Sequence, residues 1–310
     1  MNPTVSVIIP NYNHEVLVGR AINSVLAQGD DVLEVIVIDD ASTDDSVRVI
    51  EATLRGNPTV RLLRNVTNRG VIATLNRGIE EARGDFVLLG AADDIYLPGM
   101  IATCLRAADS CPDVGFVCGN AIVRWPDGSQ LSVSLPFGDT PRYISPDEVV
   151  AVGRQRNFFF YTGSALLRRK AILAAGLLPE LRWNADWLLD FVLALRHGVY
   201  YVPEEFSVVA TSPESYSQGR RNWHDQRRIL EFLIPILHQH YSDVLPRFRE
   251  AALLPSFHID FLWPLLTDPV LRRYATPLLV WRMIAFRPLQ YASRIVSWSM
   301  RQRLRVLLRM

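Results

Sequence analysis

The sequence predicts an α/β protein built on a mostly parallel β-sheet, and two observations carry this prediction. Apolar runs alternate with helical periodicities through the first 125 residues, as they do in repeated strand–helix units. Most of these runs are continuous stretches of Val, Ile and Leu, which is typical of strands that are buried on both faces. We therefore expect a central sheet covered by helices on its two sides.

The elements follow one another in regular order. Strands are expected at residues 5–10, 33–40, 60–65, 84–94 and 114–125, and the first four should be buried on both faces. Helical stripes occupy the intervals between strands, at residues 16–25, 47–54 and 72–79. Ser42 and Thr43 are expected to cap the second of these helices. A segment rich in Pro and Gly at residues 126–141 separates this half of the chain from a more mixed second half.

Composition argues against several classes of enzyme. Of the 33 basic residues only Lys170 is a lysine, so Schiff-base chemistry and a P-loop, which both need a lysine in a specific setting, are poor candidates. The first predicted strand runs into PNYN at residues 10–13 instead of a glycine-rich turn. A nicotinamide-dependent Rossmann enzyme and a sugar nucleotidyltransferase would both need such a turn. The three cysteines suit neither a zinc site nor a disulfide framework, and we expect them to be reduced.

Polar side chains collect at the carboxyl ends of three predicted strands. They follow the first, second and fourth strands and comprise Asn11, Tyr12, Asp39, Asp40, Asp93 and Asp94. In an open α/β sheet ligands bind beyond the carboxyl ends of the strands, so these side chains are expected to share one site. An aspartate after a strand often only closes a loop, but coincidence at three strand ends favours a ligand site.

Four stretches, in register, resemble the inverting glycosyltransferases of family 2, which have the GT-A fold. They are PNYNH at 10–14, IDDASTDDS at 38–46, NRGVIATLNRGIEEARGDF at 68–86 and AADDIYLP at 91–98. The resemblance is specific over roughly residues 4–125 and looser to about residue 220. It implies a catalytic domain at residues 1–224, with a donor-binding half at 1–125 and an acceptor half at 126–224. A helical extension would follow at residues 225–310.

The resemblance also implies a reaction. A sugar would move from a nucleotide-diphosphate donor, with a UDP-sugar as the first choice, to a hydroxyl of a saccharide or lipid-linked acceptor in cell-surface polysaccharide or glycoconjugate synthesis. The donor would be held by Pro10, Asn11, Tyr12, Asp39, Asp40, Arg69 and Asp93. Asp94, with His224 as a further candidate, would bind Mn²⁺ or Mg²⁺, which stabilises the departing diphosphate. The family's usual metal motif is Asp-x-Asp-Asp, and Ala91 stands in its first place here.

Asp186, in LRWNADWLLDFVLALRHG at residues 181–198, occupies the family's position for the general base, which takes the proton of the acceptor hydroxyl. Asp190 lies one helical turn further on and is the second candidate. The alternative interpretation is that an aspartate here only complements the helix dipole. By the same resemblance, the acceptor pocket would be lined by Tyr161, Thr162, Gly163 and Trp187.

The end of the chain is basic and apolar. From Pro269 to Met310 there are nine arginines and no acidic residue. This composition indicates either an amphipathic element at the inner membrane surface or a helical segment that packs on the catalytic core or on a second chain. No basic leader precedes the first strand, so we expect a cytoplasmic protein, peripheral at the membrane in the first case, with no nucleic acid among its partners.

A second function from another class stays open at this point. Ala91 and Ala185 each replace a carboxylate that is common in the family. A catalytically inactive glycosyltransferase-like module, which binds a nucleotide sugar or a partner enzyme, would explain both replacements. Nucleotide release from a donor would separate the enzyme from the binding module.

Overall fold

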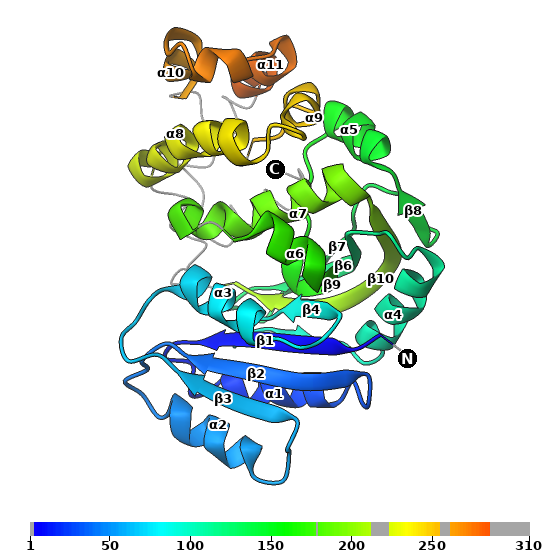
Figure 1. Ribbon diagram of the computed structural model, residues 1–310, viewed down its shortest axis with the longest axis vertical. Helices are drawn as coiled ribbons and strands as arrows, with labels where there is room; N and C mark the ends of the chain where they lie inside the picture. The colour runs from blue at the N-terminus through cyan, green and yellow to red at the C-terminus, as the bar shows by residue number, and fades with distance from the viewer. Residues whose placement is uncertain (1–2, 178, 212–222, 255–260, 286–310) are drawn as a thin grey trace.

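The computed structural model describes residues 3–177, 179–211, 223–254 and 261–285 (Figure 1). Its strands are β1 Val5–Asn11, β2 Val32–Asp39, β3 Val60–Arg64, β4 Phe86–Leu89, β5 Ile95–Tyr96, β6 Phe116–Arg124, β7 Gln130–Val133, β8 Arg142–Ile144, β9 Ala165–Arg168 and β10 Val199–Ala210. Over these described ranges they form one ten-stranded sheet in the order β3-β2-β1-β4-β9-β6-β10-β5, with β7 on β6 and β8 on β10. Strands β1 to β4 pair in parallel, as do β6 and β10, whereas β9 is antiparallel to its neighbours. The predicted mostly parallel sheet is confirmed.

Helices cover both faces of this sheet. They are α1 Val18–Leu26, α2 Ser46–Leu54, α3 Val71–Glu81, α4 Met100–Ser110, α5 Pro146–Gln155, α6 Arg169–Ala175, α7 Ala185–His197, α8 Trp223–His240, α9 Leu245–Glu250, α10 Leu262–Thr267 and α11 Pro277–Ala285, with short 3-10 helices η1 Thr162–Ser164, η2 Pro179–Asn184 and η5 Leu271–Tyr274. Successive side chains of a strand point to opposite faces. Val7 and Ile9 therefore pack with α1, α2 and α4, while Ile8 packs in the core that contains α3 and α7. Both faces need apolar residues, which explains the continuous apolar runs.

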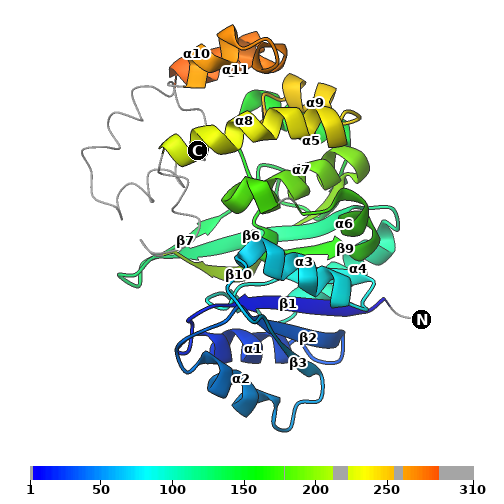
Figure 2. The same cartoon turned by 60° about the vertical axis from the view of Figure 1, so that its left-hand side comes forward.

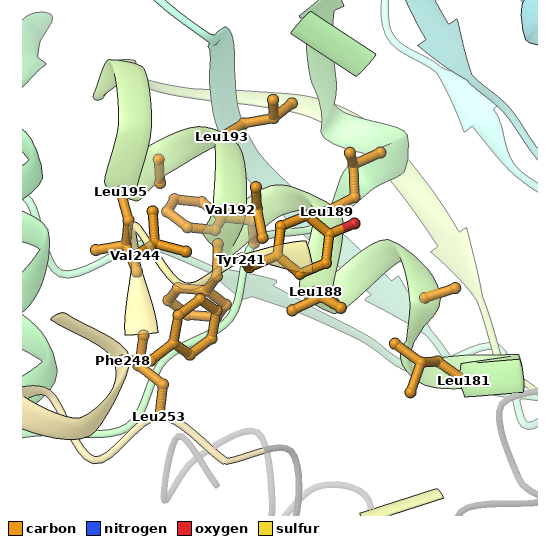
Figure 3. Packing of buried hydrophobic residues seen from close by; sticks show 14 of the residues in the cluster. Leu181, Leu188, Leu189, Val192, Leu193, Leu195, Tyr241, Val244, Phe248 and Leu253 are labelled. Carbon is orange, nitrogen blue, oxygen red and sulfur yellow. The ribbon is translucent and has the colours of Figure 1, made fainter. Parts of the chain in front are cut away.

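The C-terminal helices extend the second of these cores. Side chains of α7 lie in one buried cluster with Tyr241 and Val244, which lie between α8 and α9, and with Phe248 of α9 (Figure 3). The Phe248 ring centroid is 6.2 Å from that of Phe191 on α7. The extension expected after residue 224 is helical where the structure describes it, and its status as a separate domain stays a prediction. None of the described helices combines the length and apolarity needed to cross a bilayer.

One arginine of the basic C-terminal region is part of the core. Arg282 on α11 is buried, and its guanidinium donates to the carbonyl oxygens of Ala251 and Gly153 and to Asn157 Oδ1. These bonds join α11 to the end of α9 and to α5. The helix is therefore fixed on the rest of the fold by the buried Arg282 guanidinium, whose N–H groups donate to oxygen atoms.

Three local expectations are wrong. Ser42 and Thr43 do not cap α2, which begins at Ser46 with Asp45 at its N-cap. The Ser42 hydroxyl instead accepts hydrogen bonds from the Asn11 side chain and the Asn13 amide. The strand expected to reach residue 94 ends at Leu89, and a turn separates it from β5. Strand β3 lies at the edge of the sheet and is only partly buried, so its apolar run did not indicate burial on both faces.

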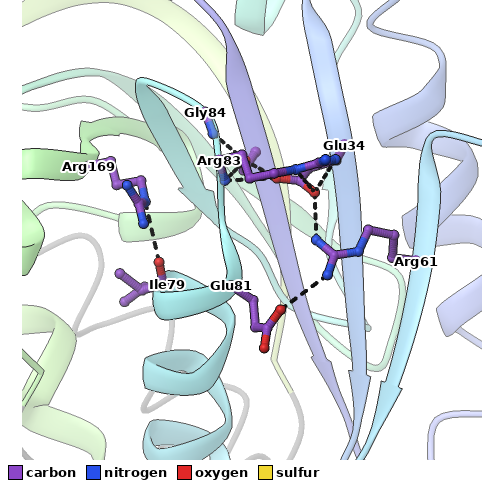
Figure 4. A network of polar contacts seen from close by, with 8 residues as sticks. Glu34, Arg61, Ile79, Glu81, Arg83, Gly84 and Arg169 are labelled. Atoms are coloured by element: carbon purple, nitrogen blue, oxygen red, sulfur yellow. Dashed lines mark hydrogen bonds and ion pairs between the residues drawn. The ribbon is translucent and has the colours of Figure 1, made fainter.

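A buried carboxylate ties the amino ends of the strands together (Figure 4). Glu34 accepts hydrogen bonds from Ser6 Oγ at 2.9 Å, Arg61 Nη1 at 2.8 Å and Arg83 Nη2 at 3.0 Å. Burial alone would raise the pKa of Glu34, but the bonds from Arg83, Arg61 and Ser6 lower it to about 2. Its stabilising effect is complete above the ordinary value of 4.5 and is lost as the pH falls toward 2. This network leaves the carboxyl ends of the strands available for a site.

Candidate active site

The ends of β1 and β2 are held together by a buried amide–carboxylate pair. Asn11 Nδ2 donates to Asp39 Oδ1 at 3.0 Å, and Asp39 Oδ2 accepts from the Ser42 amide at 3.1 Å. Both Asn11 and Asp39 are buried, whereas the Tyr12 side chain that follows is 43% exposed. Asn11 and Asp39 are therefore the buried base of a site at the strand ends, and the exposed Tyr12 ring lies next to Asn11 in the chain.

Asp40 organises the turn that leads into α3. Its carboxylate accepts from Asn65 Nδ2 at 2.6 Å, from the Arg69 amide at 2.9 Å and from the Gly70 amide at 2.8 Å. The structure thus brings Asp40 and Arg69 together, but through the backbone of Arg69. Asn65 did not stand out in the sequence, although it directly follows β3 and so repeats the pattern of polar residues at strand ends.

Asp93 and Asp94 lie in the turn between β4 and β5. Asp94 is buried, and its Oδ1 accepts from the Ala210 amide at the end of β10 at 3.0 Å. A Cβ atom at Gly163 would lie only 3.2 Å from Asp94 Oδ2, so the backbone of η1 sits directly against this carboxylate. Burial, followed by the charge of Asp93, raises the pKa of Asp94 well above its ordinary range. A cation beside the pair would favour the ionised form and lower the pKa of Asp94 again.

Two arginines that the sequence did not single out approach this pair. Arg20 on α1 donates from Nη2 to the Asp93 carbonyl oxygen at 3.5 Å. Burial raises the pKa of Asp93, while the charges of His14, Arg20 and Arg124 act in the opposite direction. Burial and the charge of Arg124 lower the pKa of Arg20. Surface arginines are common in any sequence, and only the fold brings these two to the carboxylates.

The small residues before the aspartates have a packing reason. A Cβ atom at Gly90 would lie 2.8 Å from the Tyr96 hydroxyl oxygen and 3.0 Å from the Ile8 carbonyl oxygen, so no larger residue fits without displacement. The amide of Ala91 donates to the same buried Tyr96 hydroxyl at 3.0 Å. Tyr96 therefore fixes the backbone at Ala91, and this positions the carboxylates of Asp93 and Asp94 in the same turn.

A third segment joins the site from the second half of the chain. Thr162 in η1 donates from Oγ1 to Asp190 Oδ2 on α7 at 2.7 Å. The residues before η1 form no strand, and Phe158 and Phe160 are buried against the ring of Phe191. This aromatic packing and the Thr162–Asp190 bond hold η1 between α7 and Asp94.

Asp186 lies in the first turn of α7, one turn before Asp190, and is exposed. Its Oδ1 accepts from the Trp187 amide at 2.7 Å. The Trp187 ring packs on Phe191 and Phe248, with centroids 5.3 Å and 6.0 Å away, so Trp187 is turned toward α9. The structure places Asp186 on the helix that contacts η1, while Trp187 serves packing.

The remaining predicted residues are placed less fully. The Tyr161 ring lies 4.9 Å from that of Phe159 and lines a small surface pocket with Leu135 and Pro136. Pro10 is part of β1, and its side chain is half-buried. His224 falls in the first turn of α8, and its side chain lies outside the described residues, as does the segment 212–222 before it.

The Asp93–Asp94 pair fits a divalent cation that arrives with a phosphorylated ligand. Over the described parts of the chain, no group of three or more His, Cys, Asp or Glu side chains is arranged to hold a metal ion. Mg²⁺ in nucleotide sites is usually bound by one or two carboxylates together with substrate phosphates and water. The adjacent carboxylates of Asp93 and Asp94, of which Asp94 is buried, satisfy that smaller requirement.

The raised pKa of Asp190 predicts that the stability of the protein depends on pH. Burial raises the pKa of Asp190 well above 3.8; the Thr162 bond opposes this shift, and the charge of Asp186 adds to it. The unfolded chain ionises at the ordinary pKa, so the protein loses stability as the pH rises from that value toward the raised one. We expect Asp190→Asn to remove this loss, with a gain relative to wild type of up to about 1.4 kcal/mol per pH unit. Urea unfolding at about pH 5 and about pH 8 measures it.

Asp109→Asn is the matched control, because Asp109 is an exposed aspartate on α4. The control should leave the difference between the two pH values unchanged. Equal pH dependence of wild type and Asp190→Asn would show that the Asp190 carboxyl is ionised in the folded protein.

Comparison with known proteins agrees with this geometry. The family model described as "Glycosyl transferase family 2" matches residues 6–176. The GalNAc(5)-diNAcBac-PP-undecaprenol beta-1,3-glucosyltransferase of Campylobacter jejuni is 32% identical over 169 residues, which cover 54% of each chain. The match of the family model spans the strand ends and η1, which carry most of the candidate site.

Two solved structures share the fold at low sequence identity. TarS residues 1–349 of S. aureus in complex with UDP-GlcNAc has a TM-score of 0.58 at 16% identity, with 92% of both chains covered. The mannosyltransferase PcManGT of Pyrobaculum calidifontis in complex with GDP-Man and Mn²⁺ has a TM-score of 0.53 at 18% identity, with 92% of this chain and 87% of that chain covered. The architecture is that of a GT-A glycosyltransferase, and with the family match over more than half of its length the chain belongs to glycosyl transferase family 2.

Proposed function

We propose that this glycosyltransferase moves a sugar from a UDP-sugar, with inversion at the anomeric carbon, to a hydroxyl of a saccharide or lipid-linked acceptor. Asp186 is the general base of the proposal. The observation that carries it is the chain of contacts from α7 to the carboxylate pair: Asp190 bonds Thr162, and the adjacent Gly163 lies against Asp94. A base on α7 and a cation at Asp94 would therefore serve the same bound donor.

The donor is proposed to lie across the ends of β1, β2 and β4. Tyr12 would stack on the base, the turn held by Asp40 would bring Arg69 to the base or the diphosphate, and Asp93 would bind the ribose. The UDP-GlcNAc complex of the similar TarS structure supports uridine as the first choice of nucleotide. The Arg20 and Arg124 guanidiniums, which approach the carboxylates, add positive charge where the diphosphate would bind.

A divalent cation, Mn²⁺ or Mg²⁺, is proposed to bind with the donor at Asp94. When bound, it would neutralise charge on the diphosphate as the leaving group departs. The Mn²⁺ complex of the similar mannosyltransferase supports this choice. The chain's own contribution is a buried carboxylate whose position is held by the Ala210 amide and the backbone of Gly163.

The acceptor side is proposed to lie between η1 and the start of α7. Asp186 would take the proton of the attacking hydroxyl there, and an exposed carboxylate is accessible to such a substrate. The name of the Campylobacter relative, which specifies an acceptor linked to undecaprenol diphosphate, supports a lipid-linked acceptor. With such an acceptor, the proposed reaction would take place in the cytoplasm and contribute to cell-surface glycan synthesis. Tyr161 is the side chain we would test for acceptor contacts.

A panel of UDP-, GDP- and dTDP-sugars tests the donor class. We expect a UDP-sugar with Mn²⁺ to raise the unfolding temperature, because a ligand that binds only the folded state stabilises it. EDTA should remove most of the shift. A larger shift with a GDP- or dTDP-sugar would overturn the uridine assignment and the roles given to Tyr12 and Asp40.

A further inference from the structure

Apolar side chains gather on the outer surface of the last two described helices. α10 exposes Trp263 and Leu266, and α11 exposes Trp281 and Ile284, with exposed fractions from 41% to 75%. In each helix the two side chains are three positions apart and so lie on one face. Both views place α10 and α11 at the end of the molecule opposite α2 (Figures 1 and 2). These four side chains are the C-terminal apolar patch.

The helices that carry the patch are firmly docked on the protein. Leu265 of α10 and Leu279 and Met283 of α11 are fully buried in the second core. Arg282, between the exposed Trp281 and the buried Met283, anchors α11 through three hydrogen bonds. The exposure of the patch is therefore a property of one face of packed helices.

The patch differs from other exposed apolar residues of the described chain. Single exposed apolar side chains on separate elements, such as Leu33, Val66 and Leu173, need no explanation. Within the described ranges, the tryptophans that are largely exposed are the two in the patch. Tryptophan is favoured at the boundary between water and lipid, because its ring is apolar while its N–H needs a polar partner.

The charge around the patch indicates its partner. Exposed Arg272 and Arg273 lie on η5, between α10 and α11. The chain from Pro269 to its end carries nine arginines and no acidic residue. A second copy docked through the same patch would bring Arg272 and Arg273 of the two copies together. An anionic surface instead complements the arginines and accepts the tryptophans.

We propose that the C-terminal apolar patch and the exposed Arg272 and Arg273 between its two helices bind the protein to an anionic lipid surface, with Trp263 and Trp281 in the headgroup region. Burial of the apolar face and attraction of the basic residues to anionic headgroups both contribute to such binding. The proposal goes beyond the chemistry at the strand ends, because the patch belongs to helices that contribute no residue to the candidate active site.

Flotation of the full-length protein with lipid vesicles tests the proposal. We expect binding to vesicles of phosphatidylglycerol and phosphatidylcholine in equal parts, much weaker binding to phosphatidylcholine alone, and loss of binding in high salt. The double variant Trp263→Ala, Trp281→Ala should reduce the partition coefficient roughly tenfold or more. Arg272→Gln with Arg273→Gln should also weaken binding to the anionic vesicles. The matched control is Val66→Ala with Leu173→Ala, which removes two exposed apolar side chains elsewhere.

Two further measurements separate the outcomes. Nucleotide release from a UDP-sugar without vesicles should be the same for wild type and the tryptophan variant, so a failure of the donor chemistry is recognised independently of lipid binding. Equal vesicle binding by wild type and the tryptophan variant would overturn the proposal. So would a wild-type dimer in lipid-free sedimentation that the variant converts to a monomer, because the patch would then be an interface between two copies.

Discussion

Asp186→Asn is expected to lower the turnover of sugar transfer by roughly two to four orders of magnitude, the usual contribution of a general base. The affinity for the donor should stay unchanged, because Asp186 lies on α7, and the donor is proposed to bind at the strand ends. Asparagine preserves the size of the side chain and can still accept from the Trp187 amide, so we expect the variant to fold. Initial rates and donor calorimetry on the same preparation measure both quantities.

Asp109→Asn on α4 is the control for this substitution, and it should transfer sugar at the wild-type rate. Full activity of Asp186→Asn would remove Asp186 from the reaction. Asp190 would then not be its natural replacement, since its carboxyl is buried and bonded to Thr162.

Asp94→Asn is expected to abolish the response to Mn²⁺ and to lower turnover by roughly two orders of magnitude or more, since the proposed cation would supply several kcal/mol of charge stabilisation. The free enzyme should become more stable, because burial and the charge of Asp93 make the ionised Asp94 unfavourable without a cation. The asparagine oxygen can still accept from the Ala210 amide. Loss of activity together with a gain in stability is the signature of a carboxylate kept for a ligand.

Asp93→Asn provides the comparison within the same turn. Its amide can still bond a ribose hydroxyl, so we expect a raised KM for the donor and a retained response to Mn²⁺. Chemical denaturation and metal titration of both variants separate the two roles. A normal Mn²⁺ response in Asp94→Asn would contradict the assignment of Asp94 to the metal.

The parts of the fold that depend on continuous apolar runs were predictable from the sequence. β1, β2 and β4 are each covered on two sides, and most of the residues in them are apolar. The gathering of polar residues at one edge followed, because parallel strands end on the same side of a sheet. Asn11, Asp39 and Asp94 are accordingly all found there.

Interactions between distant segments could not be predicted in the same way. The hydrogen bond between Thr162 and Asp190 joins residues 28 positions apart, and no pattern in the sequence indicates that these two residues are in contact. Arg20 is one of many helical arginines until the fold brings it to Asp93. The expected capping by Ser42 failed for a related reason, since its hydroxyl bonds to Asn11 on another strand.

The most direct test of the proposed function is the release of nucleoside diphosphate from a UDP-sugar by the wild-type protein, followed over time with Mn²⁺ and again after addition of EDTA. We expect UDP to be released with the metal and release to stop without it. Binding of the donor with no release of UDP under any condition, with the acceptor fraction of a membrane extract supplied, would contradict the account and favour an inactive nucleotide-sugar-binding module.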